Sequence, residues 1–429
     1  MKYKKYPSYK DSGVSWLCEI PIEWNITKVK HKFLLGRGRV ISLEELEEEG
    51  EYPVYSSQTK NNGILGYINS YDFDCKQITW TTDGANAGTV FLREGKHNCT
   101  NVCGTLLPIK KNENLEYLTY TLGYATTFYK RPDTNGAKIM NGEMSEIFLT
   151  FPPVEEQQQI ANFLDKATAK IDTLIEKQTK QIELLKEKRQ AVISHAVTKG
   201  INPNVPMKDS GVEWLGEIPE HWEVSKLKFY TNVKGRIGFR GYTKDDLVSK
   251  EEGALVIGAS EMNNNAKLEI KKPQYISWYK YYESPEIILN QGDLLFVQRG
   301  STVGKVAHID FDIEEATINP SLVVLKRIKL NPFYLKYYLL SNLIKAIVKV
   351  ETSNTAIPMI SQEQIGNYTL SFPKKEDEQQ QIVNYLDEKT SKIDTLIEKS
   401  NKSIELLKEK RTALISAAVT GKIDVREFV

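Results

Sequence analysis

The chain of 429 residues contains the same sequence pattern twice. Residues 208–228 repeat residues 10–30 with 13 identities in 21 positions. Residues 379–420 repeat residues 157–198 with 31 identities in 42 positions. An internal repeat of this kind predicts one structural unit used twice in the same order. We therefore expect a variable domain, a helix, a second variable domain and a second helix.

The segments between the repeated stretches diverge mainly at polar positions. Residues 80–90 align with residues 296–306, and residues 149–152 align with residues 370–373, with glycines and apolar residues kept. Short β-rich runs alternate with Gly and Asn turns in both segments, so each is expected to be a mixed α/β domain. The two domains therefore share a framework and differ in their polar surfaces.

Both repeated segments after the variable domains are predicted to be long helices. Apolar residues recur every three or four positions from Ile160 to Ala196 and from Ile382 to Ala418. A small domain cannot bury so long a helix, and the narrow apolar stripe favours a two-helix coiled coil. The near-identity of the two helices favours antiparallel pairing about a pseudo-twofold axis. Packing of each helix on its own domain remains an alternative.

The predicted fold class is therefore α+β, with two mixed α/β domains separated by two long antiparallel helices. The predicted boundaries are 1–152 for the first domain, 153–201 for the first helix, 202–373 for the second domain, 374–423 for the second helix and 424–429 for a tail.

Composition excludes several classes of protein. The formal net charge of +1 excludes a histone-like polycation, and it indicates that, whatever this protein binds, broad electrostatic attraction is not its own contribution. The N-terminal residues lack a hydrophobic signal core, and no run of 18 apolar residues occurs, so neither secretion nor a membrane span is expected. Four cysteines do not make a disulfide scaffold, which is consistent with a reducing cytoplasm.

The variable loops carry the polar groups that nucleic-acid readers use. Amide side chains can pair with adenine and arginine with guanine, while lysine and backbone N–H groups can hold phosphates. In the first domain the candidate DNA-binding residues are Gln58, Thr59, Lys60, Asn61, Thr82, Asp83, Asn86, Lys130, Arg131, Asn135 and Lys138. In the second domain they are Arg240, Lys244, Arg299, Ser301, Thr302, Lys305, Thr352, Ser353 and Asn354. Any one of these loops can also be an ordinary polar turn. Their variation within a kept framework favours two readers of different sequences.

These repeated motifs resemble a known family. The opening Ser-Gly-Val-x-Trp-Leu-x-Glu-Ile-Pro-x-x-Trp, the helix start Gln-Gln-Gln-Ile and the helix end Glu-Lys-Arg-x-x-x-Ile-Ser are similar to those of the specificity subunit of type I restriction–modification systems. The resemblance implies two target-recognition domains, each reading one half of a split, asymmetric site in double-stranded DNA. It also implies that the helices set the gap between the halves and dock two modification (methyltransferase) subunits.

The same resemblance implies where the chemistry takes place. The modification subunits would bind S-adenosylmethionine and methylate adenine, and added restriction subunits would use ATP and Mg to cut DNA. This chain would then have no catalytic residue, no metal and no cofactor of its own. Two other classes remain open, a stand-alone DNA-modifying enzyme and a coiled-coil adaptor that does not contact DNA.

Three motifs mimic catalytic or metal sites. Asn331-Pro332-Phe333-Tyr334 resembles the Asn-Pro-Pro-Tyr element of adenine methyltransferases but lacks the second proline, so we predict a helix start with proline at its first position. The segment 300–306 resembles a phosphate-binding loop, but its spacing is too short and Val306 replaces Ser or Thr. His97, Cys99 and Cys103 do not have the spacing of a zinc site, so buried thiols are predicted.

Overall fold

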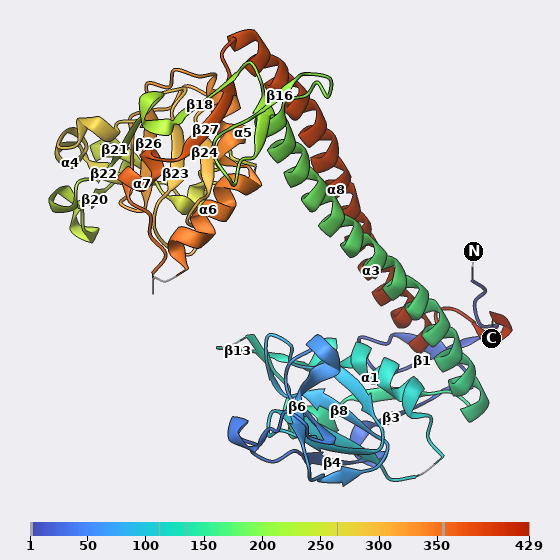
Figure 1. Ribbon diagram of the computed structural model, residues 1–429. Helices are drawn as coiled ribbons and strands as arrows, with labels where there is room; N and C mark the ends of the chain where they lie inside the picture. The colour runs from blue at the N-terminus through green and yellow to red at the C-terminus, as the bar shows by residue number, and fades with distance from the viewer. Residues whose placement is uncertain (1–2, 111, 135, 264, 354–356, 429) are drawn as a thin grey trace. The chain divides into compact units, whose positions relative to one another are not determined.

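The computed structural model describes residues 3–110, 112–134, 136–263, 265–353 and 357–428. The chain forms two compact units (Figure 1). Unit 1 comprises Met1–Thr179 and Lys402–Val429, and unit 2 comprises Lys180–Asn401. Each unit contains one variable domain together with part of both long helices. Unit 1 is therefore assembled from two segments that are far apart in the sequence, whereas unit 2 is one continuous segment.

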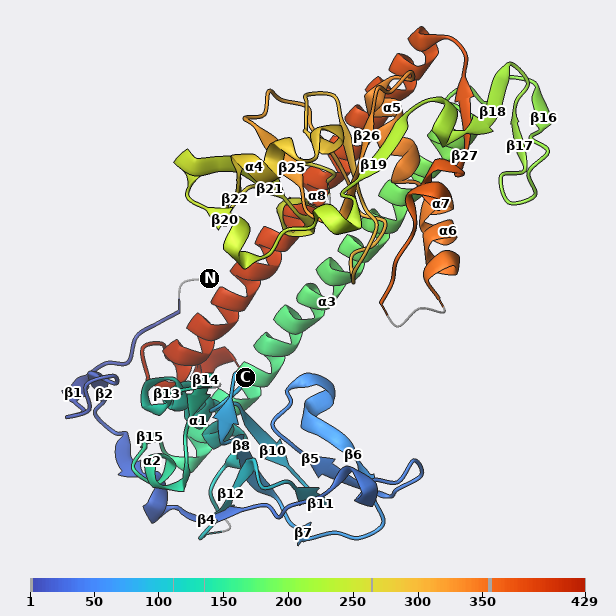
Figure 2. The same ribbon diagram turned by 90° about the vertical axis from the view of Figure 1, so that its left-hand side faces the viewer.

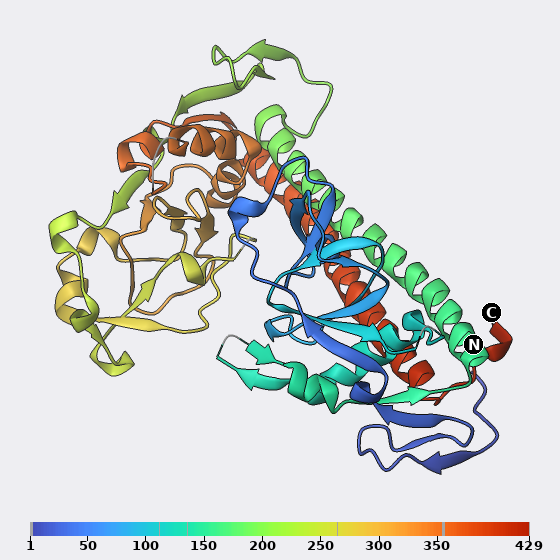
Figure 3. The same cartoon turned by 90° about the horizontal axis from the view of Figure 1, so that it is seen from below.

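Unit 1 contains two four-stranded sheets (Figure 3). The first has the order β10-β8-β12-β4 and is antiparallel, and the second has the order β6-β5-β11-β7 with one parallel pair, β5 and β11. The strands are β4 (Phe33–Arg37), β5 (Tyr52–Tyr55), β6 (Ile64–Ile68), β7 (Phe73–Asp74), β8 (Gln77–Thr81), β10 (Val90–Arg93), β11 (Lys96–Cys99) and β12 (Cys103–Pro108). All five residues of β8 are buried, because this strand has a neighbour on both sides and α1 (Leu115–Tyr129) packs on its sheet.

Smaller elements complete unit 1. They are the hairpin β1 (Tyr9–Asp11) and β2 (Glu19–Pro21), the pair β3 (Asn25–Lys28) and β15 (Phe148–Phe151), the short helix α2 (Asn141–Ser145), and a sheet of β9 (Asp83–Gly84), β13 (Arg131–Asp133) and β14 (Gly136–Lys138).

Unit 2 repeats the first sheet of unit 1 and varies the second, in which the fourth strand, β20, joins the edge opposite to that joined by β7 (Figure 2). One sheet has the order β19-β26-β23-β24, and the other has the order β20-β22-β21-β25 with the parallel pair β21 and β25. The strands are β16 (Met207–Asp209), β17 (Glu217–Pro219), β18 (Trp222–Lys226), β19 (Asn232–Gly235), β20 (Leu247–Val248), β21 (Gly253–Ile257), β22 (Gln274–Ser277), β23 (Leu294–Val297), β24 (Val306–His308), β25 (Ala316–Ile318), β26 (Leu322–Lys326) and β27 (Thr369–Pro373). The helices are α4 (Trp278–Tyr282), α5 (Pro332–Leu339), α6 (Asn342–Thr352) and α7 (Gln362–Gly366).

The two long helices are α3 (Val154–Lys199) and α8 (Glu376–Val419), which run side by side (Figures 1 and 2). Each is followed by a glycine with positive φ, Gly200 at 78° and Gly421 at 73°, which is the common way for a helix to end. The predicted fold class, α+β with two mixed α/β domains, an internal repeat and two paired antiparallel helices, is confirmed. No helix in the described ranges is long and apolar enough to cross a bilayer.

Each domain is fixed to the helices by the same set of hydrogen bonds. In unit 1, Asn114 bonds to Gln158, Tyr120 to Asp165 and Trp24 to Glu156. In unit 2 the equivalent residues form the equivalent bonds, Asn331 to Gln380, Tyr337 to Asp387 and Trp222 to Glu378. Most of these residues lie in or next to the repeated segments. The repetition therefore preserves the attachment of each domain and leaves the loops free to differ.

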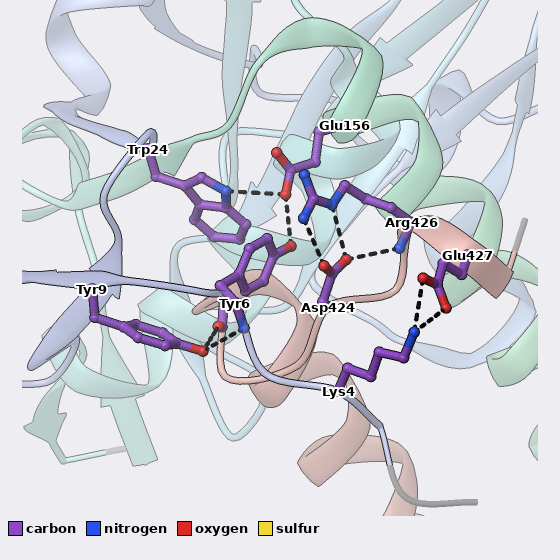
Figure 4. Close-up of polar contacts among 9 residues, drawn as sticks. Lys4, Tyr6, Tyr9, Trp24, Glu156, Asp424, Arg426 and Glu427 are labelled. Carbon is purple, nitrogen blue, oxygen red and sulfur yellow. Dashed lines mark hydrogen bonds and ion pairs between the residues drawn. The ribbon is translucent and has the colours of Figure 1, made fainter.

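Residues 4–9 contact residues 421–427 in unit 1 (Figure 4). The Asp424 N–H donates to the Lys4 carbonyl at 2.9 Å, and the Lys4 ammonium lies 2.8 Å from a Glu427 carboxylate oxygen. The hydroxyl of Tyr9 donates to the Gly421 carbonyl at 3.1 Å. In unit 2 the corresponding elements, α3 and β16, are joined directly by residues 200–206 of the chain.

Candidate nucleic-acid interface

Three polar loops of unit 1 that are distant in sequence lie next to one another. The hairpin β13–β14 pairs with β9, which places Lys138 opposite both Arg131 and Asp83. The Asn86 side-chain amide then lies 3.5 Å from the Ser57 carbonyl. The segments 57–62, 82–89, 130–134 and 136–138 therefore form one polar surface, which we call the unit 1 loop surface.

The predicted residues of this surface differ in their availability to a ligand. Thr59, Lys60, Asn61, Asn86, Lys130 and Arg131 are exposed, whereas Gln58, Asp83 and Lys138 are half-buried. Asn135 lies outside the described residues. The exposed set combines amides, a hydroxyl and cations, which are groups that can contact bases and phosphates.

Two predicted residues are used for internal structure instead. Thr82 is fully buried, and its hydroxyl donates to the Val102 carbonyl at 3.1 Å, so its prediction as a DNA contact needs correction: the side chain is not accessible. The Gln58 amide donates to the Ile64 carbonyl and closes the base of its loop. Arg131 is exposed but is paired with Glu143 at 2.8 Å, and this hydrogen bond holds the pKa of Glu143 below its usual value.

In unit 2 the loop 299–305 forms a tight turn between β23 and β24. The Gly300 N–H donates to the Pro358 carbonyl at 2.9 Å, and Arg299 forms a backbone bridge with Met359. Arg299, Ser301 and Thr302 are exposed, and Lys305 is half-buried. The backbone of the turn is thus held by its pairing with residues 358 and 359, while its polar side chains remain accessible to a ligand.

A groove of about 500 Å³ lies between this turn and α6. Its lining includes the predicted residues Thr302, Lys305 and Thr352, and also Lys345 and Lys349 of α6. Burial and the neighbouring Arg189 lower the pKa of Lys345, as expected where cations gather. The sequence reasoning missed Lys345 and Lys349. A signal was present, because residues 345, 349 and 352 recur at helical spacing on one face of α6.

The remaining predicted residues of unit 2 do not all join this groove. Ser353 is exposed at the end of α6, although its hydroxyl donates to the Val350 carbonyl, and Asn354 lies outside the described residues. Arg240 and Lys244 belong to a separate segment after β19, where Arg240 lies 3.6 Å from Glu286. Neither Arg240 nor Lys244 is among the residues that line the groove.

The motifs that mimic catalytic sites have structural roles. The Asn331 side chain accepts hydrogen bonds from the N–H groups of Phe333 and Tyr334 and caps α5. The segment 300–306 leads into strand β24, whereas a phosphate-binding loop leads into a helix.

The structure also describes the residues considered for a metal site. Both ring nitrogens of His97 have polar neighbours, Gln77 at 2.9 Å and the Gly95 carbonyl at 2.8 Å. Cys99 and Cys103 are buried. Within the described ranges, no group of three or more His, Cys, Asp or Glu side chains could hold a metal ion.

The family model and the similar proteins agree on one family. The model of the type I restriction modification DNA specificity domain matches residues 21–184 and again residues 219–406. A putative type I specificity subunit of Mycoplasma pneumoniae is 33% identical over 234 residues, which cover 51% of this chain and 62% of that protein. The specificity subunit of the type I restriction enzyme MjaVIII of Methanocaldococcus jannaschii is 26% identical, with 95% of each chain covered.

A solved structure shares the fold. A chain from a study of complex assembly and conformational transition of the type I restriction–modification system superposes with a TM-score of 0.68 at 14% identity, covering 93% of this chain and 98% of that chain. At this identity the likeness concerns the fold alone.

Proposed function

Because the chain belongs to the family of type I restriction modification DNA specificity domains, we propose that it is the DNA sequence-specificity subunit of a type I restriction–modification complex. One observation carries the proposal furthest. The two units keep the same strand order in one sheet and the same attachment to the helices, but their second sheets and their exposed loops differ. Two such domains would read the two halves of a split, non-palindromic DNA site.

Each unit offers groups for direct reading of bases. The unit 1 loop surface presents Asn61 and Asn86, whose amides suit adenine, and the turn of unit 2 presents Arg299, which suits guanine. Lys305, Lys345 and Lys349 beside the unit 2 groove would contact phosphates. With a net charge of only +1, much of the phosphate contact would come from partner subunits.

The partners of the proposed complex follow from this role. Two methyltransferase subunits would dock on the chain and carry S-adenosylmethionine, and restriction subunits would bring ATP and Mg. The chain itself would recognise DNA and scaffold the complex without catalysing a reaction or binding a cofactor. The proposed location is the cytoplasm, where such complexes meet DNA.

Methylome sequencing tests this proposal. A strain that gains this chain together with its methyltransferase partner should methylate one new bipartite, asymmetric motif that is absent when the gene for this chain is omitted. Methyl transfer by the purified chain with S-adenosylmethionine alone would instead identify a stand-alone enzyme. Absence of any DNA footprint by the assembled complex would identify an adaptor.

A further inference from the structure

Arg93, the last residue of β10, is buried beneath the loop 57–62 of unit 1. Its side chain is 2% exposed. Nη1 donates to the Asn62 carbonyl at 2.8 Å, and Nε donates to Thr79 Oγ1 at 3.2 Å. The guanidinium lies 3.6 Å from the ring centre of Tyr55 and 4.3 Å from that of Phe91. The residue thus connects the sheet to the backbone of an exposed polar loop.

The charge of Arg93 is not balanced by a carboxylate. No ion pair joins Arg93 to an acidic side chain within the described part of the chain, and its nearest polar partners are neutral. Burying a charge without a counter-ion opposes folding, and an apolar side chain of similar volume often stabilises such a position. Burial also lowers the pKa of Arg93. A role in stability alone therefore does not account for an arginine at this position.

The loop above Arg93 has an unusual backbone. Asn61, Asn62 and Gly63 have successive φ values of 49°, 52° and 78°, all in the left-handed region. Gly63 adopts this region freely, but residues with a side chain adopt it at a cost, so Asn61 and Asn62 need external support. The Asn62 carbonyl receives that support from Arg93. A Cβ added to Gly63 would lie 2.9 Å from Arg93 Nη2, so a side chain at this position would push against the guanidinium.

We propose that Arg93 is a positioning residue that fixes the conformation of the loop 57–62, so that Thr59, Lys60 and Asn61 meet the bases of one half-site. Arg93 itself does not touch DNA. It determines specificity through the hydrogen bond to the Asn62 carbonyl. The inference rests on the proposed function, since it names how one of the two readers is held in shape.

Two pairs of variants test this inference. Arg93→Met removes the donors and the buried charge, and Arg93→Lys keeps the charge but cannot span both Thr79 and the loop. The Cβ of Gly63→Ala would lie 2.9 Å from Arg93 Nη2 and 3.2 Å from the Gln58 carbonyl oxygen, whereas Gly95→Ala places a Cβ at nearly the same φ, 79°, with no atom within 4 Å. The comparison of the two alanine variants separates the contacts inside this loop from the backbone strain of a positive φ, and the Arg93 variants isolate the part that Arg93 plays.

The readout is the methylated motif, base by base, in cells that carry the variant chain and its methyltransferase partner. We expect Arg93→Met and Gly63→Ala to lower discrimination at one or more positions of one half-site by about tenfold. The other half-site should stay unchanged, Arg93→Lys should lie between wild type and Arg93→Met, and Gly95→Ala should match wild type. A merely structural role would instead lower total methylation and leave the motif unchanged.

The outcomes are decisive in each direction. An unchanged motif in Arg93→Met and Gly63→Ala, or an equal loss at both half-sites, would overturn the inference. If Arg93→Met does not accumulate as a folded chain, the difference between Gly63→Ala and Gly95→Ala decides the question. Failure of the proposed function is distinct, because the wild-type chain would then give no bipartite methylated motif.

Discussion

Arg189 donates hydrogen bonds to both carboxylate oxygens of Asp394, at 2.9 and 3.3 Å. Its repeat equivalent, Arg411, makes the same two bonds to Asp172 at the same distances. Asp172 is in turn the repeat equivalent of Asp394. The long helices thus contact each other reciprocally, as in an interface with twofold symmetry. The sign and spacing of these charges specify an antiparallel pairing with one register.

The two equivalent ion pairs should differ in strength because they differ in exposure. The side chains of Arg189 and Asp394 are 16% and 31% exposed, against 38% and 51% for Arg411 and Asp172. We expect Arg189→Gln to lower the free energy of unfolding by about 1 kcal/mol, and Arg411→Gln by about half of that. Urea denaturation with a double-mutant cycle for each pair measures both values. Equal coupling energies in the two cycles would contradict the explanation by exposure.

Arg299→Ala should change recognition in one half-site only. The turn that carries Arg299 is held by backbone hydrogen bonds such as that from Gly300 to Pro358. The turn should therefore keep its shape when the Arg299 side chain is removed. Loss of a bidentate contact to guanine should lower discrimination at that position by about tenfold or more. Motif analysis of methylated DNA measures this effect, with Lys402→Ala, an exposed cation on α8, as the control of equal charge. Simultaneous changes in both half-sites would contradict the assignment.

Shortening both long helices should shorten the gap between the half-sites. Deleting residues 177–183 and 400–406 removes opposing stretches in the register that the two Arg–Asp pairs define. Seven residues span about 10 Å of helix, which corresponds to about three base pairs of DNA. Methylome sequencing should then show a shorter gap with both half-site sequences unchanged. A motif with its original gap would show that the helices do not set the spacing.

A circular permutant that starts near Met207 should fold and assemble. In unit 1, Lys4 contacts Asp424 and Glu427, so a short linker can join the segments on either side of this contact (Figure 4). In unit 2 the residues 201–204 are exposed, so a break there exposes little additional apolar surface. Size-exclusion chromatography with the methyltransferase partner tests whether the permutant assembles. Sequencing of the methylated motif tests whether the assembled complex still recognises its site. A permutant that is insoluble with several linker lengths would count against the equivalence of the two units.

Stability should fall below neutral pH because of His308. This residue is 4% exposed, lies against Phe333 with ring centres 4.5 Å apart, and neither ring nitrogen has a partner among the described residues. Burial, with Lys336 nearby and partly offset by Asp310, lowers its pKa to about 4. The unfolded chain, with a histidine pKa of about 6.5, binds the proton first as the pH falls.

The loss should therefore begin near pH 6.5 and be complete below about pH 4, with a total of roughly 2–3 kcal/mol. Urea denaturation of the wild type and of His308→Phe at pH 8 and pH 5 measures it. The phenylalanine variant should lack this part of the pH dependence. An identical slope in both proteins would show that His308 does not titrate as its burial requires.

Much of the architecture could be predicted from local patterns. The apolar recurrence from Ile160 to Ala196 marks a helix because its period is visible within a few turns, and Gly200 marks its end. The internal repeat predicted two equivalent domains without any information on their strands. Loop positions such as Thr59, Lys60 and Arg299 were identified as polar and variable, and the structure shows them exposed. Their contacts with DNA remain predictions.

Other features depend on packing that no local pattern reveals. Thr82 and Asn86 look alike in the sequence, but one is buried by the Val102 segment and the other is exposed. Arg93 at the end of an apolar strand could equally have faced solvent.

The sequence by itself determined the duplication, the long helices and which segments vary, because helical periodicity and repetition are properties of neighbouring residues. The tertiary structure decided which loops share a surface, which cations line the groove beside α6 and which arginine lies beneath a loop. Those outcomes depend on β14 pairing with β9 and on α6 packing beside the turn 299–305, contacts between residues far apart in the chain. The burial and the hydrogen bonds of a residue depend on its neighbours in the folded protein, and these neighbours come from segments that are distant in the sequence.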